Sequence, residues 1–228
     1  MFKKKELFMK KKVLCLFILC ALSFVLLGAL ICALKFIDVG TIGPNDSKIG
    51  LASINGAVKD IFGFNEAIYD LTELLGLISL ATAAGFGVLG IVQLAKRKSL
   101  KRVDNDIYLL GCLYVAVAIF YLIFEVVVIN HRPVILEGEL EASFPSSHTL
   151  LSLCIMISAA HQLYIRLPSK LYNGIGLATA VAIATATTAL RLASGVHWFT
   201  DILGGILLSA ALLFAYFAVF ELIKKKND

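Results

Sequence analysis

Charged residues are scarce in this sequence. Asp, Glu, Lys and Arg account for 16% of the 228 residues, whereas about one quarter is usual in soluble domains. Hydrophobic residues account for 59%, and the mean hydropathy is +0.88. This composition excludes a soluble globular protein. It indicates an integral membrane protein, and a single domain is enough to account for the length.

The loops also lack paired cysteines. All five cysteines lie within apolar segments, and they are Cys15, Cys20, Cys32, Cys112 and Cys154. This distribution suggests neither a disulfide framework nor a zinc site. The polar motifs described below contain no carboxylate cluster suited to a divalent metal. We therefore expect no metal site and no cofactor.

Apolar runs dominate the chain instead. Six of them have about the length needed to cross roughly 30 Å of hydrocarbon, and they cover residues 13–34, 71–95, 107–129, 148–165, 171–190 and 199–223. The first run is longer than the core of a signal peptide and no cleavage site follows it, so we expect a retained transmembrane helix. The sequence thus predicts an all-α integral membrane bundle of six transmembrane helices. Residues 71–223 would form a five-helix core.

The polar connection at 35–70 contains a pattern of its own. Apolar residues recur at helical spacing within it, and they are Leu51, Ile54, Val58, Ile61 and Phe62. This spacing predicts a short amphipathic helix on the membrane surface. Such a helix either guides a lipid toward the site or is a passive surface element.

The positions of the basic residues predict the orientation. The net charge of +5 comes from short clusters between the apolar runs, which is not the pattern of a nucleic-acid-binding surface, and we expect no nucleic-acid partner. Most Lys and Arg residues lie in the tails at 1–12 and 224–228 and in the turns at 96–102 and 166–170. The positive-inside rule places these segments, and therefore both termini, in the cytoplasm. The short loops and lysine-rich tails suggest a bacterial plasma membrane.

Three ionisable residues lie where the fifth apolar run ends and the sixth begins, on what this topology makes the outer side. His197 and Asp201 are four residues apart, so both side chains lie on one face at a helix start. The aspartate can accept from one ring nitrogen and leave the other free to attack an electrophile. Arg191 offers a fork of donors suited to phosphate oxygens. The alternative is three interfacial polar residues with no shared role.

A second outer segment, residues 130–148, carries matching chemistry. Arg132 adds another cation, and the hydroxyls of Ser146 and Ser147 can donate to an anion where the fourth span begins. The free backbone N–H groups and the dipole of that helix also favour negative charge. His148 can protonate a departing oxygen. The acids Glu137, Glu139 and Glu141 are typical of a solvated loop.

In chain order these motifs are Arg132-Pro133, Pro145-Ser146-Ser147-His148, and Arg191 followed by His197 and Asp201. This order resembles the type 2 phosphatidic acid phosphatase family, which are membrane lipid phosphatases that share their site with vanadium haloperoxidases. The resemblance covers the six spans and about residues 70–223.

The resemblance implies a role for each matching residue. His197 would be the nucleophile that forms a phosphohistidine, with Asp201 orienting it. His148 would be the acid for the leaving alcohol and then the base for water. The phosphate would be held by four residues, which are Arg132, Arg191, Ser146 and Ser147.

The sequence departs from the family's pattern at three positions. Glu125 stands where the family has a lysine, seven residues before the arginine of its first motif. Ser147 replaces a glycine, and Leu190 replaces a serine. Glu125 would either pair with Arg132 or meet a second polar group of the substrate. His131 either contacts the substrate or is a solvated loop residue.

The function that we expect is metal-independent hydrolysis of a membrane lipid phosphate or diphosphate on the outer face of the membrane. Phosphatidic acid, phosphatidylglycerol phosphate and polyprenyl diphosphate all fit, and membrane lipids would surround the protein. One alternative is a phosphotransferase that hands the phosphoryl group to another lipid. Another alternative is a transporter or a catalytically silent binding protein. Glu125 is the feature that favours this alternative, because it replaces the lysine of the family's pattern.

Overall fold

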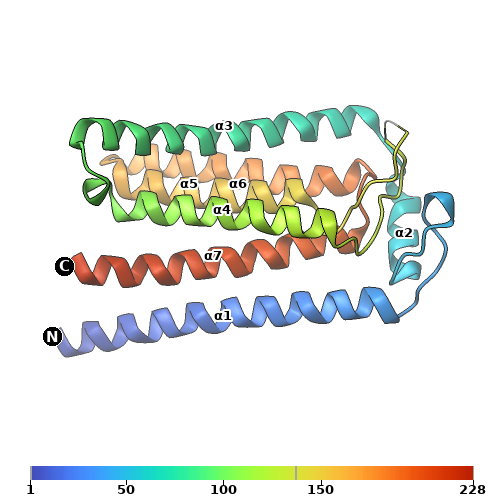
Figure 1. Cartoon of the computed structure of the whole chain (residues 1–228), viewed down its shortest axis with the longest axis horizontal. Coiled ribbons are helices and arrows are strands. Elements are labelled where there is room, and N and C mark those ends of the chain that lie inside the picture. The colour runs from blue at the N-terminus through green and yellow to red at the C-terminus, as the bar shows by residue number, and fades with distance from the viewer. Residues whose placement is uncertain (1, 137, 228) are drawn as a thin grey trace.

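The computed structural model describes residues 2–136 and 138–227. Glu137 lies outside the described residues, so its expected place in a solvated loop stays a prediction. In these described residues seven α-helices follow one another, and Figure 1 shows their arrangement. They are α1 (Phe2–Phe36), α2 (Ala52–Phe62), α3 (Glu66–Arg97), α4 (Asn105–Val126), α5 (Ser147–Arg166), α6 (Lys170–Ala193) and α7 (Phe199–Asn227), with short 3-10 turns at Pro44–Asp46 and Leu100–Arg102.

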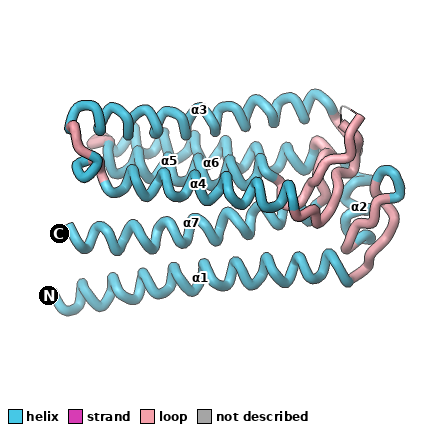
Figure 2. Tube along the Cα trace, in the orientation of Figure 1, coloured by secondary structure: helices cyan, strands magenta, loops and turns pink. Residues whose placement is uncertain are grey.

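All of these helices except α2 are long and apolar enough to cross a membrane. In the described residues the only β-type pairing consists of isolated bridges in the loops, and Figure 2 shows helices joined by loops throughout. The predicted all-α bundle of six transmembrane helices, with a short helix in the first connection, is therefore confirmed. Placement of α2 on a membrane surface stays a prediction.

Several helix boundaries differ from those that the sequence predicts, including the start of α1 and the end of α4. The helix α1 begins at Phe2 instead of residue 13, because lysines are good helix formers and extending an existing helix costs little. The helix α4 ends at Val126, since Val127 leaves helical geometry with φ −94° and ψ 81°. Residues 127–129 therefore join the loop between α4 and α5, which we call the outer loop after its predicted side of the membrane.

The six long helices run side by side, with both termini at one end of the bundle and α2 at the other (Figure 1). The helix α5 is the most enclosed of the six and packs against α3, α4, α6 and α7, while α1 packs against α7. The loops that carry the predicted site residues lie at the α2 end, where the connection after α4 crosses the starts of α5 and α7.

Polar contacts hold α2 and the loops to this end. Asn55 of α2 is fully buried and forms hydrogen bonds with Gly50 and Thr200. The loop after α6 turns at Gly195, whose φ is +71°. A Cβ atom there would lie 1.6 Å from the carbonyl oxygen of Gly63, so only glycine fits this close approach. The chain before α3 thus packs directly against the loop that leads to α7.

Candidate active site

Four of the predicted site residues come from four different segments. Arg191 lies in the last turn of α6, His197 in the short loop that follows, Asp201 in the first turn of α7, and His148 in the first turn of α5. The starts of α5 and α7 are joined directly, because the backbone N–H of Ser146 donates to the carbonyl oxygen of Asp201 at 3.0 Å. This backbone hydrogen bond joins the starts of the two helices, which also pack against each other.

His197 and Asp201 face each other as their spacing predicts. The Nδ1 atom of His197 lies 3.4 Å from Oδ2 of Asp201, and the same Oδ2 accepts the backbone N–H of Trp198 at 2.9 Å. This capping contact holds the carboxylate at the start of α7. The Nδ1–Oδ2 distance exceeds that of a normal hydrogen bond, and such catalytic contacts often tighten only in complexes.

His197 is almost completely buried among positive charges. Its side chain is 2% exposed. Burial lowers the pKa of His197 well below its ordinary value, and the charges of Arg191, Arg132 and His148 act in the same direction. The backbone of Ser143 makes a smaller, opposing contribution. The imidazole is therefore neutral at physiological pH, as a nucleophile must be.

Arg191 is fully buried, and one of its three nitrogens donates hydrogen bonds to other side chains. Its Nη1 atom donates to Oγ1 of Thr72 at 2.7 Å and to Oε1 of Glu73 at 2.8 Å, and the guanidinium lies over the ring of Tyr69 at 5.1 Å. Its Nε and Nη2 atoms are buried and have no hydrogen-bond partner in the described structure. A charged donor in such a position is unusual.

Arg132 is held by the outer loop itself. Its Nε atom lies 2.9 Å from Oε2 of Glu141, and its backbone N–H donates to the carbonyl oxygen of Glu141 at 3.0 Å. Its Nη1 atom is buried without a hydrogen-bond partner among the described residues. Arg132 thus forms its ion pair with Glu141 and not with Glu125, and Glu141 is part of the site instead of a purely solvated loop residue.

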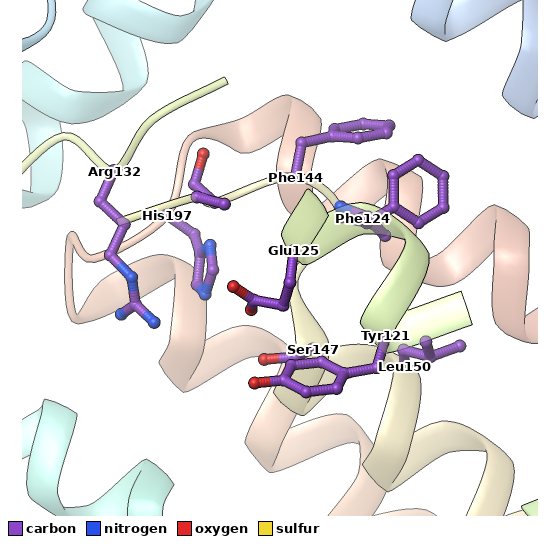
Figure 3. Close-up of a pocket in the computed structure, with 11 residues that line it drawn as sticks. Tyr121, Phe124, Glu125, Arg132, Phe144, Ser147, Leu150 and His197 are labelled. Atoms are coloured by element: carbon purple, nitrogen blue, oxygen red, sulfur yellow. The ribbon is translucent and has the colours of Figure 1, made fainter. Parts of the chain in front are cut away.

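A small hollow lies between α4, the outer loop and the α6–α7 loop. Figure 3 shows Arg132, His197 and Glu125 pointing into it, with Ser147 and the hydroxyl of Tyr121 at its lower side. Glu125 comes from the last turn of α4. It places a carboxylate in the same hollow as the predicted nucleophile.

The two serines differ in what they contact. Ser147 lines the hollow beside His197. Ser146 is fully buried, and its Oγ atom caps α5 by accepting from the backbone N–H of Thr149 at 3.4 Å. Because its own N–H is bound to Asp201, Ser146 contributes mainly to the joint between α5 and α7.

His131 contributes its backbone and anchors Trp198. Its carbonyl oxygen accepts from Nε1 of Trp198 at 2.6 Å, and the Trp198 side chain is fully buried against the outer loop. Lys59 of α2 covers the indole at 5.3 Å. These contacts tie the outer loop to the residue next to His197.

A larger apolar cavity adjoins the hollow, and the two share Tyr121, Ser147 and Leu150. It has a volume of about 490 Å³ and lies between α3, α4 and α5. Its polar end is formed by Glu73, Ser147 and His148. The remaining lining is mainly apolar and includes Leu77, Leu80, Ala83, Val117, Ala118, Leu151 and Ile155.

Glu73 is the site residue that sequence reasoning missed. It lies in α3, its Oε2 atom is 3.3 Å from Nε2 of His148, and its Oε1 atom accepts from Arg191. The one available signal was an acidic residue inside an apolar run, because ionisable groups in membrane spans are usually functional.

Comparison with known proteins agrees with this picture. The PAP2 superfamily profile matches residues 127–225, which include every predicted site residue except Glu125. A solved structure described as the first transmembrane PAP2 type phosphatidylglycerolphosphate phosphatase from Bacillus subtilis superposes with a TM-score of 0.66 and 20% sequence identity. The match covers 90% of this chain and 97% of that chain. No curated protein sequence matches the chain.

These matches confirm the predicted resemblance to type 2 phosphatidic acid phosphatases. The profile match is confined to residues 127–225, which is less than half of the chain. At 20% identity the structural match shows a shared fold. The site itself offers buried cationic donors, a neutral buried imidazole and an adjoining apolar cavity.

Proposed function

Since residues 127–225 match the PAP2 superfamily profile, we propose that the protein hydrolyses a membrane lipid phosphate or diphosphate through a phosphohistidine, without a metal ion. Both comparisons support hydrolysis of a lipid phosphate. The distribution of basic residues supports a plasma-membrane orientation with both termini in the cytoplasm and the site on the outer side. The short loops and lysine-rich tails favour a bacterial source.

One observation carries the proposal. Arg191 is completely buried, yet its Nε and Nη2 atoms have no hydrogen-bond partner in the described structure. Leaving charged donors unpaired in the interior costs several kcal/mol. An oxyanion that binds this edge of the guanidinium in a bidentate manner would recover that cost. The neutral imidazole of His197 lies within electrostatic range of the same cation.

The residues would act in two steps. His197 attacks phosphorus, the bond to the lipid oxygen breaks, and His148 donates a proton to that oxygen. His148 then takes a proton from water, which attacks the phosphohistidine and releases inorganic phosphate and the free imidazole. Asp201 orients His197 and stabilises its positive charge. Arg132, Arg191 and Ser147 would hold the equatorial oxygens.

The cavity supports an amphiphilic substrate. Its polar end contains His148 and Ser147, whereas most of its wall is aliphatic and lies among membrane-spanning helices. A hydrocarbon chain that enters it would be withdrawn from water at about 25 cal/mol per Å² of apolar surface. A soluble phosphate ester gains nothing from this wall. We therefore propose an acyl or polyprenyl phosphate as the substrate class.

The test uses purified protein in detergent with excess chelator and a panel of lipid phosphates. We expect wild type to release inorganic phosphate, and His197→Ala and His148→Ala to lose at least about 100-fold. His161→Ala is the matched control, because His161 lies at the other end of α5 and contacts Tyr216. Equal phosphate release by all four proteins would contradict the proposal that the protein is a phosphatase.

A second measurement separates hydrolysis from transfer. Substrate labelled in its phosphoryl group is incubated with membrane lipids, and the products are separated by mass. Hydrolysis yields labelled inorganic phosphate, and label in another lipid would identify a phosphotransferase. Alkaline quenching, which preserves phosphohistidine, should leave label on wild type and none on His197→Ala.

A further inference from the structure

Glu73 of α3 lies between two residues of the proposed mechanism. Its Oε1 atom accepts from Nη1 of Arg191 at 2.8 Å, and its Oε2 atom lies 3.3 Å from Nε2 of His148. A single carboxylate therefore spans a phosphate-binding cation and the proposed general acid. Glu73 belongs to none of the motifs that identify the site, and it precedes the region that matches the superfamily profile.

Other residues of α3 also contact Arg191 and His148. Thr72 is fully buried and accepts the other hydrogen bond of Arg191 Nη1, while its own hydroxyl donates to the carbonyl oxygen of Tyr69 at 2.7 Å. One turn along, a Cβ atom at Gly76 would lie 2.7 Å from Cδ2 of His148. The imidazole thus packs against bare backbone. Three neighbouring positions of α3 fit the same pair of side chains.

The contact leaves the substrate-binding groups available. Glu73 uses only Nη1 of Arg191, and the Nε and Nη2 atoms remain buried without a hydrogen-bond partner in the described structure. The Nδ1 atom of His148 is likewise buried and unpartnered there. A carboxylate that merely occupied the phosphate position would be expected to engage the fork of the guanidinium. Glu73 approaches it from one side only.

We propose that Glu73 is a positioning residue that orients His148 as a general acid and holds Arg191 in place. It accepts the Nε2–H of His148, so the site contains two carboxylate–imidazole pairs, Glu73 with His148 and Asp201 with His197. By stabilising the imidazolium form when His148 takes up a second proton, Glu73 favours the state of the ring that donates a proton to the leaving oxygen. This inference rests on the proposed function, in which His148 protonates the lipid alcohol.

The experiment compares two substrates that differ in their need for an acid. An alkyl lipid phosphate has a poor leaving group, which needs a proton from an acid. The leaving group of 4-nitrophenyl phosphate is 4-nitrophenolate, which departs without protonation. We expect Glu73→Gln to lower kcat/KM by about 10- to 100-fold for the lipid phosphate, a part of the usual general-acid contribution. The loss for 4-nitrophenyl phosphate should be several-fold smaller. Asp70→Asn removes the same charge from an exposed position of α3 and should change neither value.

Two outcomes would overturn the proposal. Equal losses on both substrates would mean that Glu73 supports the fold and not proton transfer. Unchanged or increased kcat/KM in Glu73→Gln would mean that the carboxylate competes with the phosphate. If Glu73→Gln does not fold, Glu73→Asp serves instead, because it keeps the charge but is too short to reach both partners. It should show the same substrate-dependent loss.

A separate readout distinguishes this inference from the proposed function. If wild type releases phosphate from neither substrate, the proposed function fails, and 15N NMR of the histidine rings still tests the contact. In wild type the neutral ring of His148 should carry its proton on Nε2, facing Glu73. In Glu73→Leu that preference should disappear. An Nδ1-protonated ring in wild type would overturn the inference by itself.

Discussion

Asn55 and Thr200 join α2 to the first turn of α7 through two hydrogen bonds. The Nδ2 atom of Asn55 donates to Oγ1 of Thr200 at 3.0 Å, and the backbone N–H of Thr200 donates to Oδ1 of Asn55 at 3.2 Å. Because Thr200 is adjacent to Asp201, α2 helps to position the carboxylate that faces His197. The connection between α1 and α3 is therefore a structural part of the candidate site.

Replacing Asn55 should loosen this end of the molecule. Asn55→Ala removes both hydrogen bonds and leaves a buried N–H of Thr200 unpaired, which costs about 1–3 kcal/mol. We expect a lower melting temperature, by about 2–4 °C per kcal/mol, together with reduced phosphate release. Ser53→Ala, on the exposed side of α2, is the control. Unchanged stability and activity in Asn55→Ala would show that α2 does not support the site.

Substitution of Gly195 should be far more severe. Gly195→Ala meets the carbonyl oxygen of Gly63 in a backbone conformation that L residues rarely adopt, so the α6–α7 loop has to move. We expect little folded protein, measured as the monodisperse fraction in detergent. Gly111→Ala in α4 is the matched control, since a Cβ there meets open space and alanine favours helix by about 1 kcal/mol. Folding of Gly195→Ala at wild-type yield would contradict the packing described.

The buried environment of His197 predicts its titration. Its pKa is lowered below the ordinary value of 6.5, so the folded protein binds this proton less readily than the unfolded chain. The contribution of His197 to stability is therefore complete above pH 6.5 and declines as the pH falls below it. NMR titration should place the midpoint below 6.5 for the resonance that disappears in His197→Gln. A midpoint above 6.5 would mean that the imidazole is exposed or paired with an anion.

Substitution of Glu125 tests how the charges in the hollow affect substrate binding. It shares this space with Arg132 and His197, where a carboxylate opposes binding of a phosphate. Glu125→Lys adds a cation, and we expect KM for a phosphate monoester lipid to fall. Glu139→Lys makes the same change in an exposed part of the outer loop and should leave KM unchanged. Loss of turnover in Glu125→Lys would instead assign the glutamate a role of its own with the substrate.

Much of the fold could be predicted because its signals are local. Apolar runs of membrane-spanning length mark six helices, and the spacing of Leu51, Ile54 and Val58 marks α2. The four-residue spacing of His197 and Asp201 also has a direct geometric meaning at the start of a helix. These features depend on neighbouring residues, so the sequence is enough to see them.

The remaining features depend on contacts between distant segments. Glu73 and Arg191 are 118 positions apart, and nothing near either residue indicates that α3 packs beside the end of α6. The close contact between Gly195 and Gly63 could not be predicted from the sequence for the same reason. The ion pair between Glu141 and Arg132 depends on the path of the outer loop. Composition alone predicts only that this loop is solvated.

The central claim is that Arg132, Arg191, His148 and His197 bind one oxyanion. The most direct measurement is a structure of the full chain with orthovanadate, which mimics a five-coordinate phosphorus centre. We expect vanadium within bonding distance of a His197 ring nitrogen, with its oxygens on Nε and Nη2 of Arg191. Vanadate bound elsewhere, or a site that stays empty at saturating vanadate, would contradict the account.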